Sequence, residues 1–262
     1  MRLPIERWYN AINPRHSTRN YNGKKVEQEK LDILHNLCLT FRPIDGVRAE
    51  LITTPGEKIF KGIIGGYGKI KGNAAYVAFI GRPDAPHVEE MMGYLGEGII
   101  LEATTLGLAT CWIGGFYRKG AAEAELSMAD GEQIYALTPL GYPLEKVTFE
   151  EKMMRGFKTQ RKRKPLKKLA SGIAAEQWPA WVRTGLEAAR PAPSAMNRQP
   201  WHFTVSEDSV SLGVSGKLSV GPSPRLDCGI AMLHFELGAL TQDSTVTTEM
   251  LDAQQVARFS VR

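Results

Sequence analysis

Three short stretches of the chain contain residues whose types and spacing suit the binding of a small polar ligand. The first is the loop 192–201, which contains Pro193, Ser194, Asn197 and Gln199. Its backbone amides and short side chains offer both donors and acceptors, as a flat heterocycle with carbonyls and ring nitrogens requires. The same residue types also favour an ordinary turn between a helix and a strand, so the loop by itself leaves both interpretations open.

The second stretch, Arg15-His16-Ser17-Thr18-Arg19, suits the binding of an anion. It lies between two expected helices, so its side chains and amides can converge on one group. An arginine offers a forked donor to phosphate oxygens, and the Ser17 hydroxyl adds another donor. An exposed basic loop is the alternative interpretation.

The third stretch, Cys111-Trp112-Ile113-Gly114-Gly115, ends an expected strand on two glycines. Glycine lets the backbone approach a flat ring closely, and a backbone amide there can donate a hydrogen bond to a ring nitrogen. We expect the amides of Ile113 and Gly114, rather than their side chains, to make such contacts. A strand that simply turns on its glycines is the alternative.

A strongly basic segment lies just past the middle of the chain. Residues 152–168 include many lysines and arginines and no aspartate or glutamate, and they end in the run RKRKPLKK. Such a segment could bind nucleic acid, bind the phosphate of a small cofactor, or form a solvated linker. The charge pattern alone does not choose among these three possibilities.

Taken together, these stretches resemble the motifs of the nitroreductase superfamily, whose members bind FMN between two subunits. The run Pro193-Ser194-x-x-Asn197-x-Gln199-Pro200-Trp201 is similar to the loop that one subunit extends to the flavin held mainly by the other. The resemblance covers most of the chain. It is nearest to the members in which two half-domains are fused.

The resemblance implies roles for the N-terminal stretch. A closely similar Arg-x-Ser-x-Arg/Lys motif binds FMN in the family, and His16 lies inside the matching run here. By that resemblance Arg15 and Ser17 face the ribityl phosphate. Arg19 would lie near the pyrimidine edge, where a positive charge stabilises the negative charge of a reduced flavin.

The resemblance also assigns roles to the glycine turn and to the basic segment. Ile113, Gly114 and Gly115 would approach flavin N5, the atom that gains and loses hydride. In the family a basic residue, one spacer and an arginine two residues before a proline complete the phosphate site. Arg161 and Arg163 match those positions, which favours a cofactor over nucleic acid as the partner of the basic segment.

The implied function is that of an FMN-dependent oxidoreductase. NADH or NADPH would give hydride to flavin N5, and a nitroaromatic, a quinone or a similar small acceptor would then take the electrons by a ping-pong mechanism. One alternative is a non-catalytic or regulatory flavin-binding protein. Another is a different flavin chemistry on the same fold, such as dehalogenation or flavin breakdown. The five histidines have no metal-ligand spacing, so we expect no metal.

The two halves of the chain contain similar sequence segments in the same order. A Glu-Gln pair leads a helix at 27–28 and again at 176–177, and the helix from Gly98 to Gly107 parallels the one from Gly229 to Gly238. The first half holds the anion-binding stretch and the glycine turn, whereas the second half holds the polar loop. This asymmetry predicts an internally duplicated pseudo-dimer with one complete composite site.

Apolar periodicity predicts the elements that must position these residues, in an α+β fold with a mainly antiparallel sheet flanked by helices. We expect helices at 4–13, 27–40, 89–107, 174–189 and 225–240, and strands at 49–53, 74–80, 108–113, 134–140 and 202–205, with an edge strand at 260–262. The expected division is a first half at 1–150, a basic linker at 151–172 that completes the phosphate site, and a second half at 173–262.

The bulk composition is typical of a water-soluble globular protein. Of 262 residues, 43% are apolar and 23% are charged, and the net charge is +5. We expect no membrane span and no signal peptide. Cys38, Cys111 and Cys228 are odd in number and far apart, which indicates reduced thiols and a cytoplasmic location. A fused pseudo-dimer could be a monomer or a homodimer.

Overall fold

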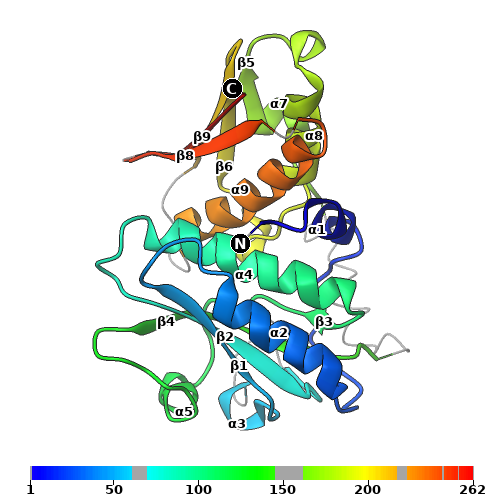
Figure 1. Cartoon of the computed structure of the whole chain (residues 1–262), viewed down its shortest axis with the longest axis vertical. Coiled ribbons are helices and arrows are strands. Elements are labelled where there is room, and N and C mark those ends of the chain that lie inside the picture. The colour runs from blue at the N-terminus through cyan, green and yellow to red at the C-terminus, as the bar shows by residue number, and fades with distance from the viewer. Residues whose placement is uncertain are drawn as a thin grey trace.

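Two β-sheets, with a pair of long helices between them, make up the described part of the chain (Figure 1). The structure is a computed structural model, and it describes residues 2–60, 70–144, 162–216, 223–243, 245–252 and 254–261. Arg161, which the sequence assigned to the phosphate site, lies outside these residues.

The N-terminal part forms the first sheet and its helices. Its strands follow the order β1-β2-β4-β3, and each neighbouring pair is antiparallel. Strand β2 is buried along its whole length because the sheet is covered on both faces. Val77 and Phe79 face the main core, whereas Tyr76 and Ile80 face a second core on the other side, as the two-residue period of a strand requires. The elements are α1 (Ile5–Ile12), α2 (Gln28–Thr40), β1 (Val47–Ile52), α3 (Glu57–Phe60), β2 (Ala75–Gly81), α4 (Val88–Thr105), β3 (Ala109–Thr110), α5 (Lys119–Glu123) and β4 (Gln133–Gly141).

The C-terminal part forms the second sheet, with strand order β5-β6-β7-β9-β8. Its pairs are antiparallel except for β5 and β6, which run parallel. The elements are α7 (Leu166–Leu169), β5 (Ala170–Gly172), the 3₁₀ helix η2 (Ala175–Gln177), α8 (Ala180–Ala189), the 3₁₀ helix η3 (Ala195–Asn197), β6 (Trp201–Val205), β7 (Ser209–Val214), α9 (Pro224–Leu240), β8 (Val246–Met250) and β9 (Gln255–Val261). Residues 166–172, predicted to belong to a linker, therefore pack with this sheet, while the division into halves at 150 and 172 stays a prediction.

The two sheets have the same topology. In each, two antiparallel strands are followed by a long helix and then by two more strands, of which the last inserts beside the second. Strands β1-β2-β4-β3 thus correspond to β6-β7-β9-β8, and α4 corresponds to α9. This arrangement confirms the predicted α+β fold with mainly antiparallel sheets and an internal duplication.

The equivalent helices α4 and α9 cross in direct backbone contact. A Cβ atom added to Gly93 would lie 2.0 Å from the Leu226 carbonyl oxygen, and one added to Gly229 would lie 1.9 Å from the Glu90 carbonyl oxygen. The two contacts are reciprocal, as a pseudo-twofold relation requires. The sequence comparison paired the correct helices but in the wrong register, because Gly93, rather than Gly98, corresponds to Gly229.

Most predicted elements are present, with three corrections. The expected helix at 174–189 is split, because Pro179 forces the preceding residue into an extended conformation and α8 begins only after it. The expected strand at 108–113 is limited to β3, with one further isolated pairing at Ile113. The strand expected at 260–262 is the end of β9, but its expected edge position is wrong, because β9 lies between β7 and β8.

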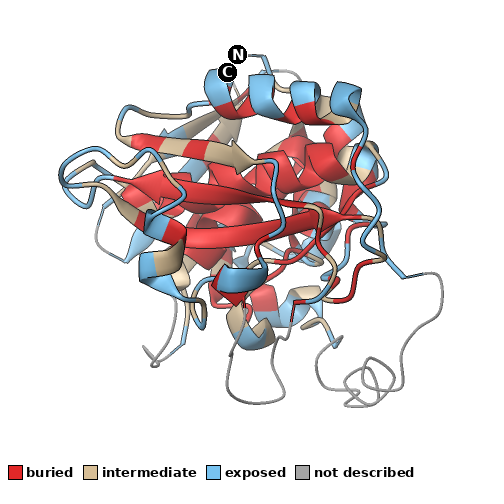
Figure 2. Cartoon of the chain, turned by 90° about the horizontal axis from the view of Figure 1, so that it is seen from below, coloured by how far each residue is buried: buried red, intermediate tan, exposed pale blue. Residues whose placement is uncertain are grey.

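Burial follows this layered arrangement. Figure 2 shows strands of the first sheet and helices behind them as buried, while the outer helix faces and the loops are exposed. Helix α4 is buried on nearly every side because it contacts the first sheet on one side and α9 on the other. None of the helices in the described ranges is long and apolar enough to cross a membrane.

The helix crossing predicts that adding a methyl group at either glycine destabilises the fold. We expect Gly93→Ala and Gly229→Ala each to lower the free energy of unfolding by about 1–3 kcal/mol. The new Cβ atoms collide with main-chain atoms of the opposite helix, which have no room to move. Urea unfolding measures this change. Gly120→Ala is the matched control, since a Cβ there meets nothing within 4 Å. Equal stability of the three variants would contradict the prediction.

Candidate functional site

The N-terminal anion-binding stretch lies against strand β3. The Thr18 amide donates a hydrogen bond to the Thr110 carbonyl at 2.8 Å, and Ser17 forms an isolated parallel bridge to the same residue. Because β3 leads directly into the glycine turn, two stretches more than ninety residues apart in the sequence become neighbours. His16 is exposed, and its Nδ1 lies 3.0 Å from the Pro14 carbonyl oxygen. The Arg19 side chain is half-buried.

One side of the glycine turn is hydrogen bonded to strand β4, and the other side is exposed to solvent. The Ile113 amide donates to the Leu137 carbonyl at 2.8 Å, and the Leu137 amide donates back at 2.9 Å. The expectation that the Ile113 amide is available to a ligand is therefore wrong, because β4 already uses it. Gly114 is exposed, and a Cβ atom at Gly115 would meet nothing within 4 Å. The open backbone begins at Gly114.

The polar loop holds an unusual backbone conformation. Met196, Asn197 and Gln199 have φ values of 51°, 54° and 50°, in the left-handed region that side chains other than glycine rarely adopt. Each such residue costs on the order of 1 kcal/mol and persists only when its surroundings hold it. Here the Gln199 amide donates to Ser194 Oγ at 2.9 Å, and the Asn197 amide donates to the Ser194 carbonyl at 3.0 Å.

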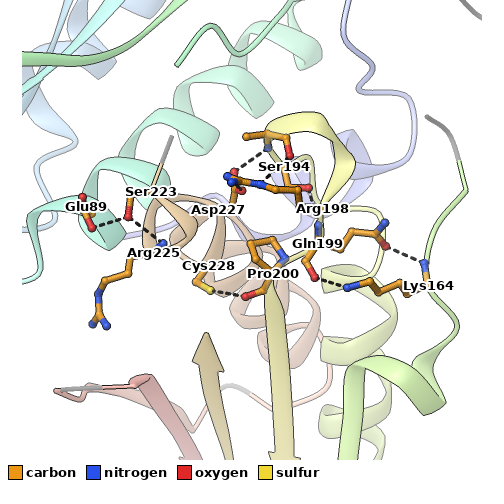
Figure 3. Close-up of polar contacts among 11 residues, drawn as sticks. Glu89, Lys164, Ser194, Arg198, Gln199, Pro200, Ser223, Arg225, Asp227 and Cys228 are labelled. Atoms are coloured by element: carbon orange, nitrogen blue, oxygen red, sulfur yellow. Dashed lines mark hydrogen bonds and ion pairs between the residues drawn. The ribbon is translucent and has the colours of Figure 1, made fainter. Parts of the chain in front are cut away.

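Asp227, in the first turn of α9, anchors the same loop (Figure 3). Its Oδ1 accepts a hydrogen bond from the Ala195 amide at 3.0 Å, and its Oδ2 lies 3.2 Å from Arg198 Nη2. Burial raises the pKa of Asp227 to about 6, while the Ala195 amide and the Arg198 charge act in the opposite direction. The anchor is thus a carboxylate that is largely removed from water.

The basic segment before α7 binds the polar loop. Arg163 Nη1 donates to Asn197 Oδ1, the Lys164 amide donates to Gln199 Oε1 at 2.7 Å, and Lys164 Nζ donates to the Gln199 carbonyl at 2.9 Å. Figure 3 shows the contacts of Gln199 with Lys164. The structure therefore brings together Arg163, Asn197 and Gln199, which the sequence predicted for one site. Pro193 is buried at the start of this loop.

Arginines from three segments form a cationic cluster, which we define as Arg15, Arg163 and Arg190. Burial, together with the nearby positive charges of Arg15 and Arg190, lowers the pKa of Arg163 to about 10, while Glu97 acts in the opposite direction. Like charges at close range destabilise one another, so this cluster favours a bound anion. Arg15 and Arg163, both predicted to bind phosphate, thus lie within electrostatic reach of each other.

Glu97, which belongs to none of the three sequence motifs, connects several parts of the site. This fully buried residue of α4 accepts a hydrogen bond from Trp112 Nε1 at 2.7 Å, and its Oε1 lies 3.6 Å from Arg15 Nε. The same Oε1 lies 2.9 Å from Nε2 of His234, which belongs to α9. One carboxylate therefore contacts the anion-binding stretch, the glycine turn and the opposite half of the fold.

A signal for Glu97 is present in the sequence, because α4 carries glutamates inside an otherwise apolar helix. Glu90, Glu97 and Glu102 are all buried. Glu102 pairs with Arg7 and accepts a hydrogen bond from Trp8 Nε1 at 2.6 Å, and Glu90 pairs with Arg225. Buried carboxylates need partners, so their presence in a core helix points to cations and donors on the elements packed against it.

The chemistry that these residues can perform is anion binding rather than metal binding. Arg15 Nε and Nη1 are buried and have no hydrogen-bond partner in the described part of the chain. Burying a donor without an acceptor costs free energy, and a bound ligand can supply the acceptor. A phosphate group offers acceptor oxygens whose geometry fits a guanidinium. No cluster of His, Cys, Asp or Glu suited to a metal is present among the described residues.

The duplicated topology, with a cationic cluster that draws arginines from both halves, defines the chain as an internally duplicated α+β protein. A family model described as "Putative TM nitroreductase" matches residues 7–239. The chain belongs to this family. The comparison with curated proteins gives no match.

Among solved structures, one shares the fold over nearly the whole chain, and others are similar over about half of it. A "putative nitroreductase" from Thermotoga maritima is 20% identical with a TM-score of 0.67, and the match covers 97% of this chain and 93% of that one. An "FMN-dependent Nitroreductase" from Clostridium difficile is 22% identical with a TM-score of 0.44, covering 52% of this chain and 87% of that one. A nitroreductase "with Bound FMN" from Bacteroides fragilis is 17% identical with a TM-score of 0.43, covering 54% and 91%.

The buried anchor Asp227 predicts a specific pH dependence of stability. Its pKa is about 6 in the folded chain, above the ordinary value of 3.8, so the folded state binds the proton more tightly than the unfolded state. Protonation therefore adds stability as the pH falls below 6, and this contribution is lost as the pH rises through 6.

We expect the unfolding free energy of the natural chain, minus that of Asp227→Asn, to increase by about 2 kcal/mol between pH 7 and pH 4. Urea unfolding of both proteins at the two pH values measures this difference, and the titration of all other groups cancels in it. A difference that stays constant with pH would contradict the assignment of the shift to Asp227.

Proposed function

We propose that this chain is an FMN-dependent oxidoreductase that takes electrons from NADH or NADPH and passes them to a small organic acceptor such as a nitroaromatic or a quinone. Donor and acceptor would use the same site in turn, in a ping-pong sequence. The observation that carries this proposal is the buried guanidinium of Arg15, which has two donor nitrogens without a hydrogen-bond partner among the described residues. Membership of the nitroreductase family supports the reaction class.

Arg15 and Arg163 are the residues that would hold the FMN phosphate. Arg15 is buried and Arg163 is half-buried, and their positive charges repel each other, so a bound dianion would relieve that repulsion. Ser17 lies next to them on the exposed side of the stretch and can add a hydroxyl donor. Arg161 would complete this set, as the family resemblance implies, but it lies outside the described residues.

The glycine turn and the polar loop would bind the flavin ring. The Gly114 backbone is exposed and Gly115 faces open space, so a flat ring can approach there without meeting a side chain. Arg19 would stabilise negative charge at the pyrimidine edge, by the family resemblance. Ser194, Asn197 and Gln199 are fixed in the loop by hydrogen bonds, so their contribution would be a preformed surface. When bound, FMN would supply hydride acceptance and donation at N5.

The composite site and the cysteines suggest an oligomeric state and a cellular compartment for the protein. Both halves of the composite site belong to one chain, so a single molecule would hold FMN without a second copy. The cysteines Cys38, Cys111 and Cys228 are free and buried, which fits a reducing compartment such as the cytoplasm.

The absorbance spectrum of purified protein with added FMN, before and after anaerobic NADPH or NADH, tests the proposal. We expect a bound-flavin spectrum that bleaches on addition of the nucleotide and recovers with a quinone or a nitroaromatic. Bound flavin that stays oxidised would indicate a flavin-binding protein without reductase activity. Absence of FMN binding would overturn the proposal.

The proposed role of Arg15 predicts that its substitution weakens the binding of FMN but not the binding of a flavin without a phosphate. Hydrogen bonds to a charged group contribute about 1.5–3 kcal/mol, so Arg15→Gln should weaken FMN binding roughly 10- to 100-fold. Fluorescence titration of the flavin measures the Kd. Riboflavin, which has the same ring without the phosphate, should bind both proteins alike.

Arg183→Gln is the matched control, because Arg183 is an exposed arginine of α8 that donates to the Ala175 carbonyl. This variant should bind FMN like the natural chain. An Arg15→Gln protein that is folded by circular dichroism and binds FMN with unchanged affinity would remove Arg15 from the phosphate site.

A further inference from the structure

A cavity of about 410 Å³ lies between the end of α1, the start of α7 and the end of α8. Its volume falls in the range of about 300–1,000 Å³ that small-molecule sites usually have. The side chains that line it include Tyr9, Ile12 and Asn13 from α1 and its C-cap, Leu166 from α7, and Glu187 and Arg190 from α8 and its C-cap.

The segments that line this cavity are the same ones that carry the cationic cluster. Arg190 belongs to both. Asn13 lies two residues before Arg15, and Leu166 lies three residues after Arg163. The main chain alone therefore keeps the Cα atoms of these pairs within about 7 Å and about 11 Å of each other. The cavity is thus an outward continuation of the site proposed for the FMN phosphate, so one ligand can reach both.

The polar side chains of the cavity have no partners within the described part of the chain. Glu187 and Arg190 are exposed and lie about one helical turn apart, yet they form no ion pair with each other or with another described residue. The Tyr9 hydroxyl and the Asn13 side chain likewise make no hydrogen bond to a described residue. Apolar walls with a few polar groups that fix the orientation of a ligand are typical of small-molecule sites.

We propose that this cavity binds the adenosine phosphate half of a dinucleotide whose other half lies in the flavin site. The inference rests on the proposed function, and it extends the ligand of that site. Arg190 would bind the second phosphate of the pyrophosphate, beside the first phosphate at Arg15 and Arg163. The Glu187 carboxylate would accept hydrogen bonds from the ribose hydroxyls, as acidic residues do in other dinucleotide sites.

The rest of the lining suits a flat base. The ring of Tyr9 and the apolar side chains of Ile12 and Leu166 offer surfaces on which adenine can pack. The Asn13 amide offers one acceptor and one donor group, which match the ring nitrogen and the amino group at the edge of adenine. Phosphate, sugar and base of this half therefore each have a partner of the required chemistry.

Two kinds of dinucleotide contain this half. In FAD it is joined to the phosphate of the FMN portion, so one FAD molecule would fill the flavin site and the cavity together. In NADH or NADPH it belongs to the electron donor, which would use the cavity while FMN occupies the flavin site. FAD fits better, because the cavity begins at the cationic cluster rather than at the glycine turn proposed for the flavin ring.

Isothermal titration calorimetry of the full chain, freed of flavin, with FMN and then with FAD measures the two Kd values. A hydrogen bond to a charged group changes an equilibrium constant by roughly 10- to 100-fold, so we expect FAD to bind tighter than FMN by that factor. The ratio of the two Kd values is the measured quantity, because Arg190 also acts on the phosphate cluster that FMN would use.

Two substitutions in the cavity locate the effect. Arg190→Gln and Glu187→Ala should each bring the ratio of the Kd values for FMN and FAD close to one, because each removes a partner of the adenosine phosphate half. Arg183→Gln is the matched control, since Arg183 is an exposed arginine of α8 that donates to the Ala175 carbonyl and does not line the cavity. The ratio should stay unchanged in this variant.

A second arm tests the electron donor as the source. In the FMN-loaded protein, NADH is compared with reduced nicotinamide mononucleotide, which lacks the adenosine phosphate half. If the donor uses the cavity, NADH has the lower KM at the same kcat, and Arg190→Gln and Glu187→Ala both remove the difference.

The outcomes separate this inference from the proposed function. An advantage of FAD over FMN, or of NADH over the mononucleotide, that is lost in both cavity variants supports the site and identifies its source. Equal behaviour in both arms, or an advantage that persists in the variants, overturns the cavity site and leaves the oxidoreductase function standing. Absence of binding by either flavin overturns both.

Discussion

The close crossing of α4 and α9 is the contact on which the rest of the structure depends. Helix α4 carries Glu97 and packs on the first sheet, and α9 carries His234 and the loop anchor Asp227 and packs on the second. Because Gly93 and Gly229 let the two backbones touch, the separation of the helices is set by main-chain atoms rather than by adaptable side chains. A wider crossing would pull Glu97 away from His234 and move the polar loop away from the glycine turn.

Much of this architecture could be predicted from the sequence. The apolar stripes of α2, α4 and α9 have the period of helices, and the short continuous apolar run of β2 is typical of a strand buried on both faces. The motifs around Arg163 and Asn197 were expected to meet, and they are hydrogen bonded. The register of the duplication could not be derived, since the sequence offers several glycines per helix and only the crossing selects one.

Other features depend on contacts that no local pattern encodes. The Ile113 amide is used by β4, and this follows from how the turn folds back on the sheet rather than from the glycines beside it. Glu97 and His234 are 137 residues apart, and each alone looks like an isolated polar residue in an apolar helix. Tertiary structure determines which buried carboxylate meets which donor, so a single sequence reveals that a partner is needed without revealing its identity.

The joining of both sheets in one chain has a consequence for how the molecule behaves on dilution. When a site lies between separate subunits, lowering the protein concentration takes the site apart by mass action. Here the contact of Glu97 with His234 and the glycine crossing are intramolecular, so the local concentration of one half around the other is fixed by the connecting chain. Formation of these contacts between the two halves is therefore a first-order folding event, which does not depend on the protein concentration.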